Sequence, residues 1–276
     1  MSTKENRSDT ESLYVFGTGN ATVTHCYNTC FAIRTGEEYF MVDTGGGNGI
    51  LGILDEMKVP LHGIHHIFIT HEHTDHLLGI VWMVRMIGTA MKKGRYEGTL
   101  SIYCHDELTE TIKTICRLTL QKKFYDLIGR QILLIPVSDG ETRQILGYPI
   151  TFFDIHSTKA RQFGFTTRLK NGRKLTCTGD EPCSECCETW AAGSFWLLHE
   201  AFCLYREREI FHPYEKHHST VREACALAER LHIPNLVLWH TEETHLADRK
   251  RLYTEEGKCF YHGTLLVPED REIIEL

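Results

Sequence analysis

The sequence predicts a single α/β domain that spans residues 1–276. Short apolar runs of strand length alternate with segments in which apolar residues recur at helical spacing. A hydrophobic fraction of 42% can supply a sizeable core. No repeat, low-complexity linker or long charge block divides the chain. We therefore expect one domain rather than two small ones.

The N-terminal third is predicted to be a β-meander. Strands are expected at residues 13–16, 27–34 and 39–42, with the turn Gly17-Thr18-Gly19-Asn20 after the first. A glycine-rich stretch, Asp43-Thr44-Gly45-Gly46-Gly47, follows the third strand. It lacks the Lys-Ser/Thr pair of a phosphate-binding loop. We interpret it as a tight turn near the functional site, with a direct ligand contact as the alternative.

The densest chemical motif is Thr70-His71-Glu72-His73-Thr74-Asp75-His76. It lies between an apolar strand at residues 66–69 and an apolar segment with helical spacing that starts at Leu77. In a strand-to-helix turn, His71 and His73 share one side of the extended residues, and Asp75 and His76 enter the first helical turn. Imidazole and carboxylate suit zinc, manganese or iron. The motif predicts a site for two divalent metal ions, with zinc as the first choice; the alternative is a solvated histidine-rich loop.

The rest of the chain continues in the same style. Strands are expected at residues 100–104, 131–136, 150–155, 195–198 and 235–239, and helices near 107–120, 221–231 and 247–255. Residues 163–169 and 174–177 are expected to form a hairpin around Asn171-Gly172. His156, Asp180 and His240 each come just after an apolar strand. A lone histidine there is more often a turn residue, but strand ends along one sheet edge converge, so these residues and the motif together predict one metal site.

The pattern His71-x-His73-x-Asp75-His76, then His156, Asp180 and His240, resembles the metallo-β-lactamase fold and in particular its ribonuclease Z branch. The resemblance runs from the Gly17-Thr18-Gly19 turn to His240. Further branch-like segments are residues 154–157 with Phe163-Gly164-Phe165 after them, residues 197–202, and residues 216–220. The resemblance implies a four-layer αβ/βα sandwich, with two sheets packed face to face and helices outside.

The resemblance also implies roles for individual residues. Metal one would take His71, His73 and His156; metal two would take Asp75, His76 and His240; Asp180 would bridge them. The implied reaction is hydrolysis of a phosphodiester by a metal-bridging hydroxide, which Asp75 would help to orient. Glu200 and His218 would form an acid–base pair that protonates the leaving alkoxide. His218 is preferred to His217 because the family pattern reads His-Ser-Thr.

Several departures from the family concern the substrate. The interval between His156 and Asp180 is too short for the long arm with which ribonuclease Z enzymes grip tRNA. The basic N-terminal segment of the family has no match, and the family's Ser-Arg run after the last histidine is replaced by Thr241-Glu242-Glu243. We expect these glutamates to repel polyanions. The expected partner is therefore a phosphodiester, either RNA or a small molecule such as a cyclic nucleotide.

Composition limits the location and the partners. The formal net charge of −7 argues against a general nucleic-acid-binding surface. No apolar run reaches the roughly 18 residues of a membrane helix, and residues 1–12 are polar rather than a secretory signal. We expect a cytoplasmic protein without membrane contact, whose 11 cysteines form no disulfide framework. Enzymes of the resembled branch are commonly dimers, so the resemblance allows a homodimer.

Three functions stay open at this point. The first is a metal-dependent phosphodiesterase or endonuclease of the ribonuclease Z type. The second keeps the fold and the metals but hydrolyses a carbonyl substrate, a lactone or a thioester; the Glu200 and His218 features speak against it. The third is a non-catalytic metal-binding regulatory protein, for which lost ligands would be expected. Cys183, Cys186 and Cys187 are interpreted as loop thiols near the cavity rim, with a structural metal site or a redox-sensitive or metal-delivery loop as alternatives.

Overall fold

The computed structural model describes residues 11–276 and contains two seven-stranded sheets. The elements of the first half of the chain are β1 Ser12–Gly17, β2 Cys30–Thr35, β3 Glu38–Val42, α1 Gly49–Glu56, β4 Ile64–Phe68, α2 Thr74–Leu77, α3 Gly79–Lys92, β5 Leu100–Cys104, α4 Asp106–Thr119, α5 Lys122–Tyr125 and β6 Ile132–Pro136. The elements of the second half are β7 Thr142–Ile145, β8 Tyr148–Asp154, β9 Phe163–Arg168, β10 Lys174–Cys177, α6 Glu185–Ala191, β11 Trp196–Glu200, α7 Arg208–Phe211, α8 Val221–Arg230, β12 Asn235–Trp239, α9 Arg249–Gly257, β13 Thr264–Leu266 and β14 Ile273–Glu275. Short 3₁₀ turns cover Leu61–Gly63, Tyr205–Glu207 and Tyr214–Lys216.

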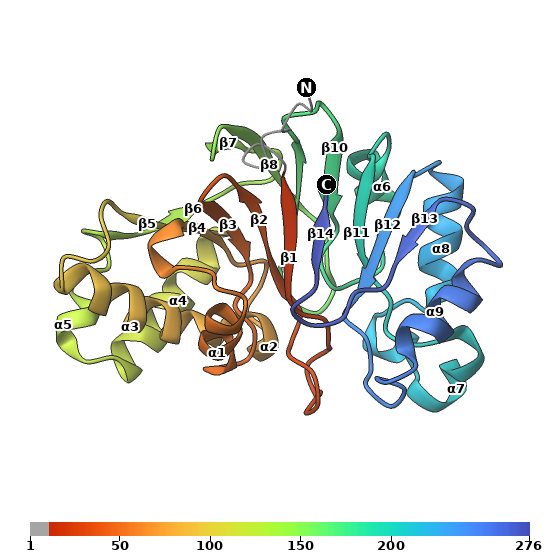
Figure 1. Cartoon of the computed structure of the whole chain (residues 1–276), viewed down its shortest axis with the longest axis horizontal. Helices are drawn as coiled ribbons and strands as arrows, with labels where there is room; N and C mark the ends of the chain where they lie inside the picture. Colours follow the sequence, from red (N-terminus) through yellow and green to blue (C-terminus); the bar gives the residue numbers. More distant parts are fainter. Residues whose placement is uncertain (1–10) are drawn as a thin grey trace, which may run out of the picture.

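The two sheets form the inner layers of the molecule. The first has the order β14-β1-β2-β3-β4-β5-β6 and the second β13-β12-β11-β10-β9-β8-β7. Helices α1 and α3 to α5 lie outside the first sheet, and α6, α8 and α9 lie outside the second (Figure 1). This is the four-layer αβ/βα sandwich that the sequence analysis expected.

Aromatic side chains fill the space between the sheets. Phe31 stacks on Trp239 with ring centroids 4.6 Å apart, and Phe40 meets Phe165 edge to face at 5.5 Å. Separate apolar clusters pack α1, α3 and α4 on the first sheet and α8 on the second. Because both faces of each sheet are covered, β5, β11 and β12 are buried along their whole length.

Strand directions bring distant chain segments to one edge of the sandwich. Strands β3 to β6 are parallel to one another, as are β10 to β13. The C-terminal ends of β10, β11 and β12 therefore lie side by side, and Asp180, Glu200 and His240 lie at or just beyond these ends. A sheet edge of this kind is where α/β proteins usually place their binding site.

Most predicted elements are present, with shifted ends. Strands β5, β10 and β12 have the predicted bounds, and the predicted β1–β3 meander and β9–β10 hairpin are both antiparallel. The helix that follows the motif is divided into α2 and α3. Strands β7, β13 and β14 and helices α1, α5, α6 and α7 were not predicted. The cysteine-rich segment predicted as a loop contains α6.

Within residues 11–276 there is no helix with both the length and the apolar character needed to cross a bilayer. The polar N-terminal stretch lies, except for its last residues, outside the described part of the chain. The single-domain organisation and the cytoplasmic location stay predictions.

Candidate metal centre

The histidine-rich motif occupies the turn between β4 and α2. His73 is the N-cap of α2, so Asp75 and His76 lie in its only full turn. The glycine-rich stretch packs beneath this turn: the Thr44 N–H donates to the His76 carbonyl at 3.0 Å, and the Gly79 N–H donates to the Gly45 carbonyl at 2.8 Å. A Cβ atom on Gly79 would clash with the Thr44 carbonyl oxygen, so only glycine permits this approach. The structure thus supports the tight-turn interpretation.

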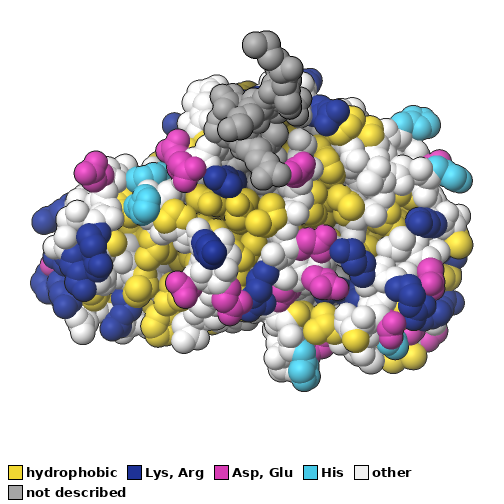
Figure 2. Space-filling view, in the orientation of Figure 1, with side chains coloured by type: hydrophobic (Ala, Val, Ile, Leu, Met, Phe, Trp, Pro, Cys, Tyr) yellow, Lys and Arg dark blue, Asp and Glu magenta, His cyan; other side chains and the backbone are white. Residues whose placement is uncertain are grey.

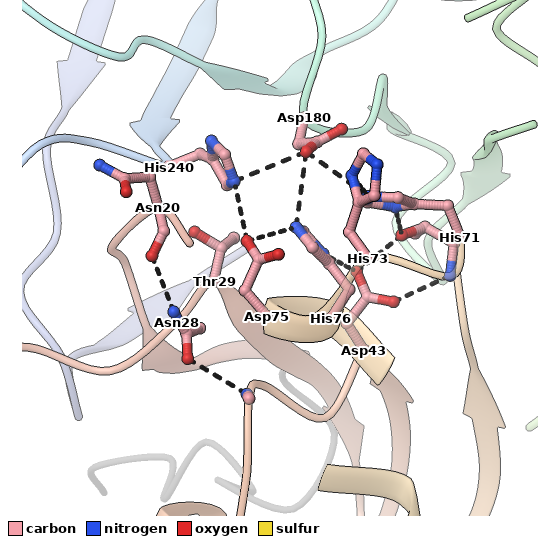
Figure 3. Close-up of polar contacts among 12 residues, drawn as sticks. Asn20, Asn28, Thr29, Asp43, His71, His73, Asp75, His76, Asp180 and His240 are labelled. Carbon is pink, nitrogen blue, oxygen red and sulfur yellow. Dashed lines mark hydrogen bonds and ion pairs between the residues drawn. The ribbon is translucent and has the colours of Figure 1, made fainter. Parts of the chain in front are cut away.

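Asp43, at the end of β3, orients two of the imidazole rings (Figure 3). Its Oδ2 accepts hydrogen bonds from the His76 ring at Nδ1, 2.7 Å, and from the Thr70 hydroxyl, 2.8 Å. Because the Thr70 hydroxyl donates to Asp43, it accepts from Nδ1 of His71, 2.9 Å away. Both rings therefore carry a proton on Nδ1 and turn Nε2 toward the centre.

Six side chains form two groups of three around this centre. His71, His73 and Asp180 form the first group and Asp75, His76 and His240 the second, with the ligand atoms of each group within 4.8 Å of one another. Oδ2 of Asp180 lies 3.6 Å from Nε2 of His71, of His76 and of His240. This carboxylate therefore contacts both groups, as expected of a bridging ligand (Figure 3).

The donor set fits divalent cations. His71, Asp180 and His240 are at most 5% exposed. His76 Nε2, Asp180 Oδ1 and both ring nitrogens of His240 have no hydrogen-bond partner among residues 11–276. Buried polar atoms without partners are costly, and a bound cation would satisfy them. Imidazole nitrogen together with carboxylate oxygen is the ligand type of zinc, manganese and iron sites.

Burial and neighbouring charge shift the protonation of these groups in opposite directions. Burial lowers the pKa of His71 well below its usual value. Burial alone would raise the pKa of Asp180, but interaction with the neighbouring rings of His71, His76 and His240 holds it well below the usual value. His76 and His240 lower the pKa of Asp75 in the same way. For His76, burial lowers the pKa, but the Asp75 and Asp43 carboxylates outweigh it and raise the pKa well above its usual value. Both carboxylates are thus ionised and able to bind a cation.

The structure differs from the prediction for His156. Its side chain is exposed and lies with residues 157–161 in a neighbouring hollow, not with the six grouped residues. Its backbone is left-handed, with φ +56°, and its N–H donates to Oδ1 of Asp154 at 2.7 Å. The loop it begins is closed by the Ile155 N–H, which donates to the Gln162 carbonyl. In this geometry Asp180 completes the first group. The predicted role of His156 as the third ligand of metal one gains no support from it and stays untested.

Glu200 and His218 lie in the arrangement expected of an acid–base pair. Glu200, the last residue of β11, is fully buried, and its Oε2 lies 3.5 Å from Nδ1 of His218. Its Oε1 accepts from the Ser219 N–H at 2.6 Å. The His218 ring stacks on Phe202, and its centroid is 5.0 Å from that of His240. His217 is exposed and contacts Thr158, which supports the choice of His218.

A cavity of about 560 Å³ contains this centre. His73, Asp75, Asp180, His218 and His240 line it. The other residues that line it are Asn20, Ala21, Thr22, Glu72, Thr74, Lys159, Phe202 and Lys216. Neither Glu242 nor Glu243 lines it, and the expected repulsion of polyanions by these glutamates stays a prediction. Glu242 accepts from the Thr244 N–H, and Glu243 accepts from the backbone of Thr24 and His25.

Sequence reasoning missed Asp43 and Thr70 as functional residues. Asp43 was seen only as part of a turn, and its distance in sequence from His76 hid the contact. One local signal was available: Asp43 is a carboxylate directly after an apolar strand. The structure adds that its backbone is left-handed, with φ +57°, a state that is uncommon outside glycine. Cys183, Cys186 and Cys187 do not line the cavity, and none of them belongs to a three-residue metal group within the described chain.

The chain is similar to several known proteins. Ribonuclease Z from Thermococcus sibiricus is 26% identical over 315 residues, an alignment that covers 94% of each chain. The metallo-β-lactamase fold protein YhfI from Bacillus subtilis superposes with a TM-score of 0.80 at 17% identity, over 97% of this chain and 100% of that one. Human tRNase Z, short form, superposes with a TM-score of 0.71 at 20% identity, over 95% of this chain and 98% of that one.

These likenesses confirm the predicted metallo-β-lactamase fold and the predicted ribonuclease Z-like character; the chain is a metal-dependent hydrolase of this type. A family model described as "Anti-Pycsar protein Apyc1" matches residues 11–258. Because this match spans most of the sequence, the chain belongs to the Anti-Pycsar protein Apyc1 family.

Proposed function

We propose that this chain is a dinuclear phosphodiesterase whose substrate is a small phosphodiester, with a cyclic nucleotide as the leading class. The observation that carries the proposal is the buried Glu200–His218 pair, whose His218 lines the same cavity as residues of both metal-binding groups. His71, His73 and Asp180 would hold one ion, and Asp75, His76 and His240 the other, with zinc as the first choice. Bound ions would lower the pKa of water and neutralise charge on the phosphate.

The residues around the cavity have distinct tasks in this proposal. Oε2 of Glu200 faces Nδ1 of His218 at 3.5 Å, which leaves Nε2 of that ring for the substrate. A protonated His218 donates to the leaving alkoxide, while Asp75 both binds metal and orients the nucleophile. A carbonyl substrate would place no phosphate oxygens next to His218, which is why the lactone or thioester alternative ranks second.

Three observations favour a small substrate over RNA. The cavity volume of about 560 Å³ lies within the range typical of small-molecule sites. The chain between His156 and Asp180 contains only the loop 156–162 and the short β9–β10 hairpin, with no long arm. Figure 2 shows acidic and basic side chains interspersed across the middle of one face, whereas protein surfaces that bind nucleic acid are basic.

RNA stays the second candidate because a relative is named ribonuclease Z. A homodimer remains a prediction from the family resemblance.

The test is metal-dependent hydrolysis of bis(p-nitrophenyl) phosphate, followed by cyclic nucleotides and RNA. We expect Asp75→Ala to abolish turnover and His218→Ala to slow it by about 10²- to 10⁴-fold, the usual contribution of a general acid. His217→Ala is the matched control because this neighbouring histidine is exposed, and it should retain wild-type rates. Hydrolysis of lactones or thioesters by a metal-loaded enzyme that leaves all phosphodiesters intact would show that the proposal is wrong.

A further inference from the structure

A buried arginine lies directly behind the segment that carries His240. Arg249, the first residue of α9, is 2% exposed. Its Nη1 donates to the Thr241 hydroxyl at 2.8 Å, and its Nη2 donates to the Thr18 hydroxyl at 2.9 Å and to the Pro268 carbonyl at 3.0 Å. A guanidinium is buried only at a large desolvation cost, so its donors must be well satisfied. This one is satisfied by three segments that are far apart in sequence.

The charge of Arg249 is balanced through a hydroxyl group. Thr18 accepts from Arg249 and donates to Oδ1 of Asp270 at 2.7 Å. The other oxygen of Asp270 accepts from the Tyr27 N–H at 2.5 Å. Thr18 therefore links a buried cation to a carboxylate and has a single hydroxyl orientation. This chain of hydrogen bonds ties the C-terminal segment to the loop after β1.

All three polar groups of Thr241 belong to the same network. Its N–H donates to the Thr18 carbonyl at 3.1 Å, and its carbonyl accepts from both the backbone and the side-chain N–H groups of Asn20, each at 3.0 Å. Its hydroxyl accepts from Arg249. The position and orientation of the residue that follows His240 are therefore fixed from three sides.

His240 depends on this anchoring more than the other buried histidines do. His71 and His76 are oriented by hydrogen bonds to their Nδ1 atoms, whereas neither ring nitrogen of His240 has a hydrogen-bond partner among the described residues. The backbone of His240 is left-handed, with φ +58°, a conformation that a non-glycine residue keeps only where its surroundings enforce it. The placement of this ring is thus set through its backbone.

We propose that Arg249, together with Thr18, Thr241 and Asp270, is a positioning group for His240. It holds the His240–Thr241 turn in place and thereby completes the Asp75, His76 and His240 group. The inference rests on the proposed function, because it takes His240 as a metal ligand. It also assigns a task to the C-terminal segment: Pro268 and Asp270 belong to the support of the metal centre.

The test is titration of the metal-free full-length protein with Zn²⁺, by competition with a chromophoric chelator. Loss of a residue that supports a metal ligand typically weakens metal affinity by about 10- to 100-fold. We expect Thr241→Val to weaken one of two zinc equivalents by about this factor, and Thr241→Ser, which keeps the hydroxyl, to restore it. Arg249→Gln should act on the same equivalent. Arg251→Gln, an exposed arginine in the same helix, is the matched control.

The double variant His240→Ala with Thr241→Val separates positioning from general stability. If Thr241 acts through His240, adding Thr241→Val to His240→Ala causes no further loss of zinc affinity. Equal zinc affinities in Thr241→Val and wild type, accompanied by a lower melting temperature, would overturn the inference and leave the network with a structural role only. Wild-type protein that binds fewer than two zinc ions would instead contradict the proposed function. Because Thr241→Val removes one hydroxyl and conserves volume, it stays informative even if Arg249→Gln does not fold.

Discussion

The two halves of the chain supply the metal centre in different ways. The first half contributes His71, His73, Asp75 and His76 from one turn between β4 and α2. The second half contributes Asp180 and His240, one residue each from the ends of β10 and β12. Rings from the first half are oriented by hydrogen bonds to ring nitrogens, whereas His240 is placed through its backbone. In the contiguous motif, hydrogen bonds to the side chains of His71 and His76 orient the ligands. For His240, which stands alone after β12, the backbone that follows the strand must be held in place instead.

The largest effect should come from the residue that joins the two halves. Oδ2 of Asp180 is equally close to rings of both groups, 3.6 Å from His71 and from His240. Asp180→Asn removes the shared negative charge, so we expect the loss of both metal ions and of all measurable turnover. Metal content after dialysis and the hydrolysis rate measure this. Asp126→Asn, an exposed carboxylate paired with Lys122, is the control; two retained metal ions in Asp180→Asn would contradict a bridging role.

A smaller effect is expected at Asp43, which supports two of the three histidines of the first half, His76 directly and His71 through Thr70. The side-chain amide introduced by Asp43→Asn would place its NH₂ group against the Nδ1–H of His76 or the hydroxyl of Thr70, two groups that now donate to the carboxylate. We expect Asp43→Asn to weaken zinc binding by about 10- to 100-fold. Both zinc equivalents should weaken, because His71 and His76 belong to different groups. If Asp43→Asn weakened only one zinc equivalent, as expected for Thr241→Val, the two halves would not differ in how they support their ligands.

The sequence predicted what depends on local pattern. The motif was found because an apolar strand, four metal-binding side chains and a helical apolar pattern follow one another within a short stretch. Strand β12 has its predicted bounds because four of its five residues are apolar. No local pattern predicts the role of Arg249, and only the position of Asp43 directly after a strand hints at its role. Arg249 contacts Thr18, 231 positions away in the chain, and Asp43 contacts His76, 33 positions away. Such contacts exist only once the sheets have formed.

The elements that were missed share this dependence on tertiary contacts. Strand β14 covers only Ile273–Glu275 and exists because it pairs with Ser12, Leu13 and Tyr14 of β1. Strand β7 is polar apart from Ile145 and is formed by pairing with β8. Helix α6 is a seven-residue helix whose Cys187 packs near Phe153 and Ile155, and its short cysteine-rich sequence lacks the periodicity of a longer helix.

His156 shows that a position just after a strand does not by itself place a histidine in the metal centre. Strands β8 and β10 run in the same direction, so their C-terminal ends lie at the same edge of the second sheet. His156 and Asp180 follow these two ends. It nevertheless lies outside both groups, because its left-handed backbone and the hydrogen bond to Asp154 lead its loop away. We expect His156→Ala to bind two zinc ions with wild-type affinity. Loss of one zinc equivalent in this variant would support the predicted role of His156 as the third ligand of metal one.

The smallest effect concerns a second long-range contact of the segment after His240. Partial burial alone would raise the pKa of Glu243, but hydrogen bonds from the N–H groups of His25 and Thr24 outweigh it and lower the pKa to about 2, from 4.5. A carboxyl group with a lowered pKa in the folded state stabilises the fold above its unfolded pKa, and this stabilisation is lost as the pH falls toward the folded value. Glu243→Gln should therefore cost about 1 kcal/mol at neutral pH, after allowance for its partial exposure.

This cost should disappear between about pH 4.5 and pH 2. Melting temperatures of wild type and Glu243→Gln across this range measure it, with Glu97→Gln, an exposed carboxylate, as control. Zinc affinity should not change, because Glu243 holds the loop at Thr24 and His25 and contacts neither His240 nor Thr241. A loss of zinc affinity in Glu243→Gln would mean that His240 is anchored by the whole segment after β12. In that case the positioning of His240 could not be assigned to Thr241 alone.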